Sequence, residues 1–171
     1  MPTATSCSLV GRGDERDGRL AEAAHVMMYE FVTQATIAAP RETVWRVLTD
    51  MDGYAEWNPE IVAIDGRMAL NERILARVKV GNGAIRSVPL RVTVFEAPLR
   101  MEWVGGLPLG LFTGRRILTV TPGDGTAEFG MVVQMSGFLA PMMVKAVGDR
   151  QAEIDGFSKA LKTRAERMAG A

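Results

Sequence analysis

The sequence predicts an α+β protein built on one curved antiparallel sheet of about six to seven strands, covered by a long C-terminal helix. Short segments that alternate apolar and polar residues, such as residues 73–80, follow one another across glycine- and proline-rich turns, as antiparallel strands do. The helical patterns lie outside this run of strands, at residues 40–57 and from residue 139 onward. A single-layer sheet curls and has one face to cover, and the last helix is the natural cover.

Local signals predict the first strand and the two short helices that follow it. Residues 29–38 alternate as a strand does. Pro40 suits the first turn of a helix, and apolar residues then recur at spacings of three and four: Val44, Val47, Leu48 and Met51. Asp50 and Asp52 predict the turn that ends this helix, because carboxylates at this spacing near a helix end do not point together as a catalytic pair. A second short helix ends at Asn58-Pro59.

Alternation and turn signals predict the remaining strands at residues 60–65, 73–80, 85–96, 99–104, 114–121 and 126–136. Pro89 has no N–H, so it predicts a sheet edge or a bulge early in its strand. Residues 105–112 are apolar and glycine-rich and are predicted to form a loop. Four basic residues are predicted to form an outer face of the sheet that lacks the interleaved aromatic rings of a nucleic-acid site: Arg77, Lys79, Arg86 and Arg91.

A helical period runs from Leu139 to near the C-terminus and predicts one long helix. Gly148 and Gly156 lie inside that helix, and each weakens it by about 1 kcal/mol relative to alanine. We interpret these glycines as points where the helix bends or approaches the sheet closely.

Composition excludes several classes of function. The 171 residues include 20 basic and 20 acidic side chains, so no net charge favours nucleic acid or an anionic membrane. No apolar run reaches the ~20 residues that a membrane-spanning helix needs. The only histidine, His25, lies in the N-terminal segment, which removes Ser-His-Asp and Cys-His catalysis and histidine-based metal sites from the rest of the chain. The single cysteine, Cys7, rules out an internal disulfide, and we expect a cytoplasmic protein without metal or cofactor.

Residues 1–28 mix polar residues and glycine without a sustained period, which predicts a disordered tail before a single domain at residues 29–168. Met27 and Met28 directly precede the first strand. We therefore expect the tail to be an extension upstream of the start codon, which sequencing the N-terminus of the native protein would test.

One stretch of the sequence carries a family resemblance. Residues 44–59 read V-W-x-V-L-T-D-x-D-x-Y-x-x-W-N-P, which resembles the START/SRPBCC superfamily of Bet v 1-like and polyketide cyclase/dehydrase-like proteins. The resemblance extends over residues 31–166 and implies a helix-grip fold, in which the sheet wraps the last helix and leaves a cavity between them. Members of this superfamily include binders, carriers and enzymes, so the resemblance identifies the fold and leaves the function open.

The alternation predicts which side chains face the last helix, Val94 among them. That face is apolar and rich in methionine, which adapts its shape to irregular apolar surfaces. A dry core would give the same pattern, whereas the resemblance favours a cavity. The residues predicted to contact a ligand are Trp57, Leu90, Val92, Trp103, Phe112, Arg116, Leu118, Met131, Val133, Met135, Met142 and Phe157.

Arg116 breaks the apolar pattern of this face. It stands where related sequences often carry a histidine, and Met131 and Val133 stand where many relatives carry His and Glu, so this sequence departs from their polar pattern. A buried, unpaired guanidinium is costly, which leaves three interpretations. Arg116 reaches solvent at the mouth of a cavity, pairs with a protein carboxylate, or binds an anionic group of a ligand.

We predict that the protein binds a small hydrophobic or amphipathic molecule of lipid or polyketide type, between the sheet and the C-terminal helix. The resemblance implies an alternative, a metal-free cyclase/aromatase or dehydratase that uses the same cavity, with Arg116 or Tyr54 stabilising an enolate. A further alternative is a partner-binding module that uses an apolar rim formed by residues 107–112 and 137–143. We expect a monomer or weak homodimer, no nucleic acid and no stable membrane insertion.

Overall fold

The computed structural model describes residues 28–80 and 83–170. Residues 1–27 of the predicted tail, with Cys7 and His25, lie outside the described residues, as do Gly81 and Asn82 of one predicted turn, whereas Met28 is the first residue of β1. The elements, in chain order, are β1 (Met28–Ile37), α2 (Arg41–Thr49), α3 (Tyr54–Trp57), β2 (Ile61–Gly66), β3 (Arg73–Lys79), β4 (Ile85–Glu96), β5 (Arg100–Leu107), the 3-10 turn η2 (Pro108–Gly110), β6 (Phe112–Pro122), β7 (Ala127–Ser136), α4 (Ala140–Val147) and α5 (Arg150–Ala169).

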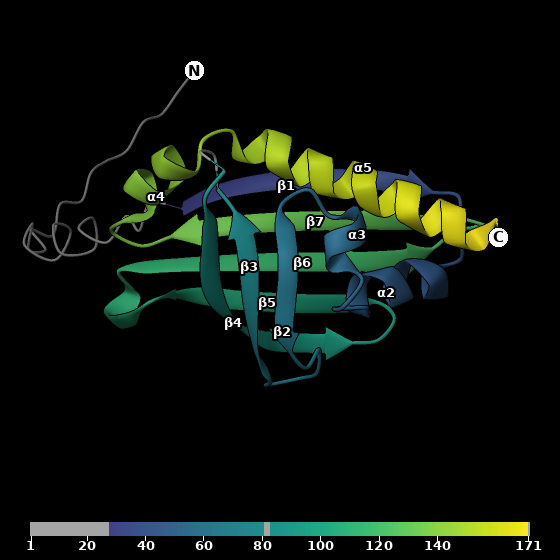
Figure 1. The fold of residues 1–171 in the computed structure, drawn as a ribbon, viewed down its shortest axis with the longest axis horizontal. Coiled ribbons are helices and arrows are strands. Elements are labelled where there is room, and N and C mark those ends of the chain that lie inside the picture. The colour runs from purple at the N-terminus through teal and green to yellow at the C-terminus, as the bar shows by residue number, and fades with distance from the viewer. Residues whose placement is uncertain (1–27, 81–82, 171) are drawn as a thin grey trace, which may run out of the picture.

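The seven strands form one antiparallel sheet in the order β1-β7-β6-β5-β4-β3-β2 (Figure 1). The sheet curves so strongly that β2, β3 and β4 cross the direction of β5, β6 and β7 in Figure 1, while α5 lies along β1 and reaches α2. The predicted α+β architecture, with a curved sheet around a long C-terminal helix and two short helices after the first strand, is confirmed.

The two short helices close one end of the sheet. Val44 and Leu48 bury the inner side of α2, and Asp50 accepts a hydrogen bond from the backbone N–H of Gly53 at 3.2 Å, which confirms its predicted turn role. The side-chain oxygen of Asn58 accepts hydrogen bonds from the backbone N–H groups of Glu60 and Ile61, at 2.9 and 2.7 Å. Asn58 thereby fixes the chain as it leaves α3 and enters β2.

Polar side chains of α5 cover the free edge of β1. The amide nitrogen of Gln151 donates to the carbonyl oxygen of Val32 at 2.9 Å, and Glu166 accepts from the backbone N–H of Ala38 at 2.8 Å. The ammonium group of Lys162 donates to the carbonyl oxygen of Thr36 between them. Backbone groups that β7 does not pair are therefore satisfied by the helix.

Two expectations about the strands are wrong. Residues 105–107 and 112 belong to β5 and β6, so the predicted apolar loop shrinks to the turn η2. A β-bulge between Val92 and Val94 turns Val94 to the outer face opposite Glu102, and Phe95 takes its place beside the core. The edge expected at Pro89 is present locally, because β4 lies between two strands but is paired only with β3 at that residue, and its pairing with β5 begins at Arg91.

The C-terminal helical region is two helices rather than one. Gly148 ends α4 with φ 88° and ψ −139°, a conformation open almost only to glycine, and Asp149 then caps α5 by accepting a hydrogen bond from the N–H of Ala152 at 3.0 Å. Gly156 does lie inside α5, where an alanine Cβ would meet only the ring of Pro59, at 3.8 Å.

The two glycines are therefore expected to respond in opposite directions to alanine. Gly148→Ala should lower the free energy of unfolding by about 1–3 kcal/mol, because it forces a side chain into a strained backbone region. Gly156→Ala should raise the free energy of unfolding by about 0.5–1 kcal/mol, because alanine loses less backbone entropy in a helix. Urea unfolding of both variants tests this, and equal effects at the two positions would contradict the break at Gly148.

Candidate functional site

A cavity of about 420 Å³ opens between the inner face of the sheet and the junction of α4 and α5. Its wall is mostly apolar, with Ala76 and Val78 of β3, Leu90 of β4, and Val133 and Met135 of β7 among the contributors. It lies at the end of the sheet where the ladder pairing of β4 with β5 stops, next to Pro89.

Two glycines at this end of the sheet have different effects on the cavity. Gly105 approaches β4 so closely that a Cβ would lie 2.7 Å from the carbonyl oxygen of Pro89. Gly114 pairs with Met135 on the inner face of the sheet, and a Cβ there would lie 3.6 Å from the ring of Phe112 and 3.8 Å from the carbonyl oxygen of Gly105, both ordinary contact distances. The absence of a side chain at Gly114 therefore leaves open volume, whereas glycine at position 105 permits a close approach of two strands.

The structure divides the twelve predicted site residues into a lining group, a core group and one exposed residue. Six of them line the cavity: Leu90, Trp103, Phe112, Arg116, Val133 and Met135. Five others pack in the hydrophobic core away from the cavity: Trp57, Val92, Leu118, Met131 and Phe157. Met142 projects to solvent on α4, while its neighbour Met143 lines the cavity. Ligand contact by the six lining residues stays a prediction.

The division has a simple cause. α5 and the two short helices fill the far half of the inner face with large side chains: Trp57 stacks edge-on against Phe157 at 5.3 Å between ring centres, and Phe157 lies 6.2 Å from Phe129. α5 begins only at Arg150, so its apolar side chains reach one half of the sheet and leave the other half open.

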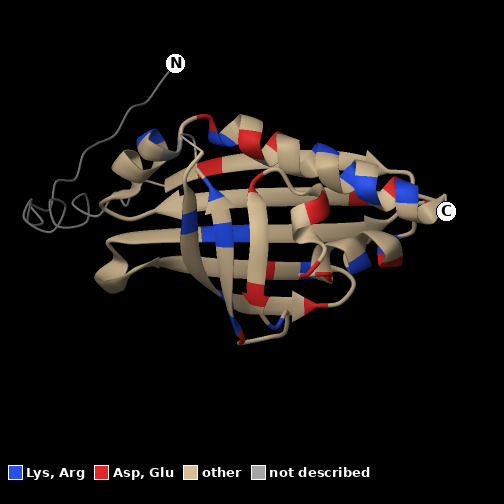
Figure 2. Ribbon diagram, viewed as in Figure 1, with Lys and Arg blue, Asp and Glu red and all other residues tan. Residues whose placement is uncertain are grey.

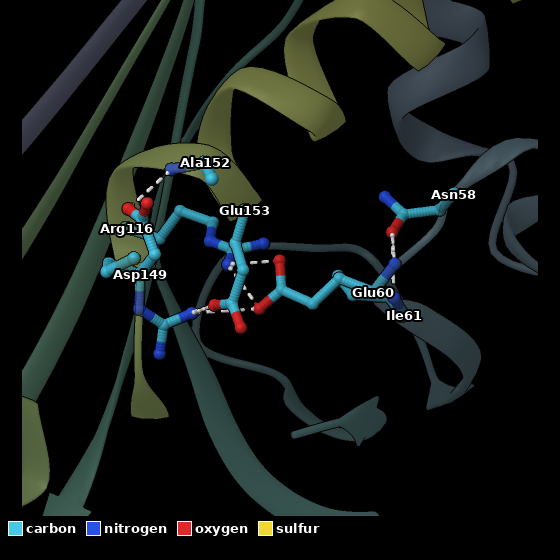
Figure 3. Close-up of polar contacts among 8 residues, drawn as sticks. Asn58, Glu60, Ile61, Arg116, Asp149, Ala152 and Glu153 are labelled. Carbon is cyan, nitrogen blue, oxygen red and sulfur yellow. Dashed lines mark hydrogen bonds and ion pairs between the residues drawn. The ribbon is translucent and has the colours of Figure 1, made fainter. Parts of the chain in front are cut away.

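A buried ion cluster forms the polar part of the wall. Nη2 of Arg116 lies 3.2 and 3.3 Å from the two carboxylate oxygens of Glu60, and Nη1 of Arg150 lies 3.0 Å from Oε1 of Glu60 (Figure 3). The same Nη1 of Arg150 lies 2.8 Å from the carboxylate of Glu153. Only 6% of the Glu60 side chain and 14% of each arginine side chain is exposed, so of the three interpretations of Arg116 the structure supports pairing with a protein carboxylate.

Each member of the cluster is held by its own element. Asn58 fixes the backbone of Glu60, and the Asp149 cap sets the first turn of α5, which carries Arg150 and Glu153 one turn apart (Figure 3). The guanidinium of Arg116 also lies 5.5 Å from the ring centre of Phe157, a favourable cation–π distance. Two positive and two negative side chains therefore balance in a wall of fixed geometry.

Electrostatics keeps the central carboxylate ionised. Burial by itself raises the pKa of Glu60, but the adjacent Arg116 and Arg150 outweigh burial, and the pKa of Glu60 falls below its ordinary value of 4.5. For Glu153 the balance is reversed: burial raises its pKa despite Arg150, and the negative charge of Glu60 adds to the increase. Glu60 is therefore the anion to which both arginines are anchored.

Comparison with known proteins places this architecture in a family. Residues 28–166 match the family model described as polyketide cyclase / dehydrase and lipid transport. The chain belongs to this family. A search of curated proteins gives no match.

Solved structures share the fold of this polyketide cyclase/dehydrase family member. A START superfamily protein from Mycobacterium smegmatis superposes with a TM-score of 0.65 at 18% identity, over 81% of this chain and 98% of that one. The Zhui aromatase/cyclase from Streptomyces sp. R1128 gives 0.66 at 19% identity, over 82% and 95% of the two chains. A protein from Mesorhizobium loti gives 0.63 at 21% identity, over 81% and 98%.

An apolar rim adjoins the mouth of the cavity in this family member. The turn between β5 and β6 exposes 96% of Leu109, and the link from β7 to α4 exposes 85% of Phe138. A hydrogen bond of 2.9 Å from the N–H of Leu139 to the carbonyl oxygen of Leu111 joins the two segments. The turn carries no charged residue in Figure 2. Within the described residues, no helix is long and apolar enough to cross a membrane.

Sequence patterns did not single out Glu60 or Arg150. Glu60 was assigned only to the start of a strand, and Arg150 was hidden in a helix predicted to be continuous across Gly148. The signal that points to both is the inward-facing Arg116, which needs a partner in an apolar wall. In the part of the chain that the structure describes, no group of three His, Cys, Asp or Glu side chains is arranged to hold a metal ion.

Proposed function

We propose that this protein binds a small hydrophobic or amphipathic molecule in the cavity between the sheet and the α4–α5 junction. The observation that carries the proposal is the cavity itself, whose volume of about 420 Å³ falls in the range of ~300–1,000 Å³ typical of small-molecule sites. Its wall is largely apolar, and burial of apolar surface contributes about 25 cal/mol per Å² before the costs of association are subtracted.

Polar atoms in the wall support an amphipathic ligand over a purely apolar one. The indole N–H of Trp103 and the Nε–H of Arg150 are buried and have no hydrogen-bond partner among the described residues, and both residues line the cavity. A few well-placed donors in an otherwise apolar pocket orient a ligand and distinguish it from a plain hydrocarbon. The family description, which names polyketide cyclases and lipid transport, is consistent with ligands of this kind.

The residues of the wall favour binding over catalysis. The described titratable residues of the cavity wall are Glu60 and four arginines, of which Arg115 turns its side chain to the outer face. Glu60 is held in its ionised form with a lowered pKa, which makes it a weak base. Tyr54, the other candidate for stabilising an enolate, is fully buried outside the cavity wall and donates its hydroxyl to the carbonyl oxygen of Leu48 at 2.9 Å. The described residues of this wall supply no acid–base pair, which supports binding over the cyclase or dehydratase reaction.

Filling the cavity from Gly114 tests the proposal. Gly114→Val should weaken the binding of a neutral apolar probe, N-phenylnaphthylamine, by about tenfold or more, because the new side chain occupies the volume and its Cβ meets only ordinary contacts. Fluorescence titration gives the affinity, and thermal unfolding checks that the variant folds. Thr121→Val, on the exposed outer face of the same strand, is the matched control and should bind the probe as the unmodified protein does.

Two results would count against the proposal. Equal affinity in Gly114→Val and Thr121→Val would place the bound probe elsewhere, for example on the apolar rim. Absence of probe binding to the unmodified protein, together with native mass spectrometry that finds no co-purified small molecule, would remove the proposal altogether.

A further inference from the structure

One arginine of the cavity wall differs from the others in its surroundings. Arg86 pairs across the ladder with Val78, just as Val88 pairs with Ala76 and Leu90 with Ile74. Directly opposed residues of an antiparallel pair share a face of the sheet, and Ile74 and Ala76 are buried on the inner face. Arg86 therefore belongs to the inner face, and its expected place on a basic outer face with Arg77, Lys79 and Arg91 is wrong.

The charges of the other arginines in the wall are already matched. Arg116 and Arg150 are neutralised by Glu60 and Glu153, and Arg115 turns to the outer face, where it lies 3.4 Å from Glu102. Arg86 lines the cavity, is solvent-exposed, and forms no ion pair or side-chain hydrogen bond with any described residue. It is thus the uncompensated positive charge of the wall among the described residues.

Arg86 is placed where a charged side chain can meet the polar end of a ligand at the mouth of the cavity. Arg86 lies in the first half of β4, after the turn that follows β3, and it lines the cavity. The residue is solvent-exposed, so its charge stays hydrated. The long arginine stem packs along apolar neighbours while the guanidinium remains in water. A guanidinium binds a carboxylate through two parallel hydrogen bonds, which a neutral hydroxyl cannot accept in the same way.

We infer that Arg86 makes the cavity selective for amphipathic ligands with an acidic headgroup, and that Arg116 does not. The apolar body of such a ligand would lie against Trp103 and Met135, with its carboxylate at the mouth on Arg86. This inference rests on the proposed binding function and names the ligand class of the same site. The alternative, in which the ligand headgroup binds Arg116, is disfavoured because Glu60 already neutralises the charge of Arg116.

A matched pair of ligands tests the inference. Decanoic acid and decanol have the same chain and differ in headgroup charge at pH 8, and each displaces N-phenylnaphthylamine from an apolar site if it binds there. The unmodified protein is expected to prefer the acid by about three- to tenfold, the range of a partly solvated ion pair. Arg86→Met should abolish this preference, because only the acid loses an ion pair, and added salt should weaken only the binding of the acid.

Arg91→Met is the matched control, because Arg91 lies on the same strand, is also exposed, and pairs with Arg73 on the outer face. It should keep the preference for the acid. An unmodified protein without that preference, or an Arg86→Met variant that retains it, would overturn the role of Arg86 and leave the proposed apolar binding intact. Failure of both ligands to displace the probe would overturn the proposed function and this inference together.

Discussion

Glu60→Ala is expected to lower the free energy of unfolding by about 3–5 kcal/mol, the usual cost of removing one partner of a buried ion pair. The variant would leave Arg116 and Arg150 facing each other across an apolar wall, with only Glu153 to compensate two positive charges. Urea unfolding at pH 7 measures the effect. The loss arises mainly from the stranded arginines, so a double variant, Glu60→Leu with Arg116→Met, should recover part of it.

Asp65→Ala is the matched control for Glu60→Ala. Asp65 also pairs with an arginine on an adjacent strand, at 2.7 Å, but about half of each side chain is exposed, so its loss should cost less than about 1 kcal/mol. A similar small cost for Glu60→Ala would mean that water solvates the cluster and that Glu60 is not the buried anchor of Arg116 and Arg150.

The contribution of Glu60 should also depend on pH. Its pKa is lower in the folded protein than its ordinary value of 4.5, so the stability that it contributes is fully present above that value and is lost as pH falls through the lower folded pKa. The difference in unfolding free energy between the unmodified protein and Glu60→Ala should therefore be largest near pH 7 and shrink in acid. A difference that grows in acid would reverse the sign assigned to the pKa shift.

Phe157→Ala is expected to lower the free energy of unfolding by about 3–5 kcal/mol, because it removes a fully buried aromatic side chain from the core. Phe157 packs between Trp57 and Phe129 and also lies under the guanidinium of Arg116, so its loss leaves a void and weakens the support of the ion cluster. Thermal and urea unfolding measure the change.

Phe138→Ala is the control for Phe157→Ala, because 85% of Phe138 is exposed and its truncation should change stability by less than about 0.5 kcal/mol. A variant at position 157 that unfolds normally but binds N-phenylnaphthylamine weakly would contradict the core role of Phe157. It would then belong to the cavity wall, as the sequence pattern had predicted.

These predictions show where sequence patterns are informative and where they are not. Alternation is a local property, so it correctly places Phe129, Met131 and Val133 on the inner face of β7. It cannot say which half of that face is filled, because this depends on where α5 begins, far away in the chain. The bulge that turns Val94 outward shifts the alternation by one residue, and no turn residue in the sequence marks it.

The ion cluster illustrates a second limit. Arg116 is visible as an anomaly in an apolar strand, but its partner Glu60 lies 56 positions away, and only the folded chain brings it to Arg116. Arg150, which shares Glu60 with Arg116, lies 34 positions away from Arg116. The inward position of Arg86 is predictable from the sequence, because the alternation that places Leu90 on the inner face also places Arg86 there. The charge of Arg86 favoured the outer face, but the alternation along β4 gave its correct position.

The covered edge of β1 bears on how copies of this chain behave at high concentration. An exposed strand edge offers unpaired N–H and C=O groups that recruit strands from other molecules and seed fibrous aggregates. Gln151, Lys162 and Glu166 occupy those groups on β1, so an incoming strand would first have to strip three polar side chains of α5 from the edge. At the opposite margin β2 is only six residues long and interrupted by a bulge, which leaves little ladder to extend. Both edges of the sheet therefore resist fibre growth, and α5 protects the β1 edge in addition to covering the core.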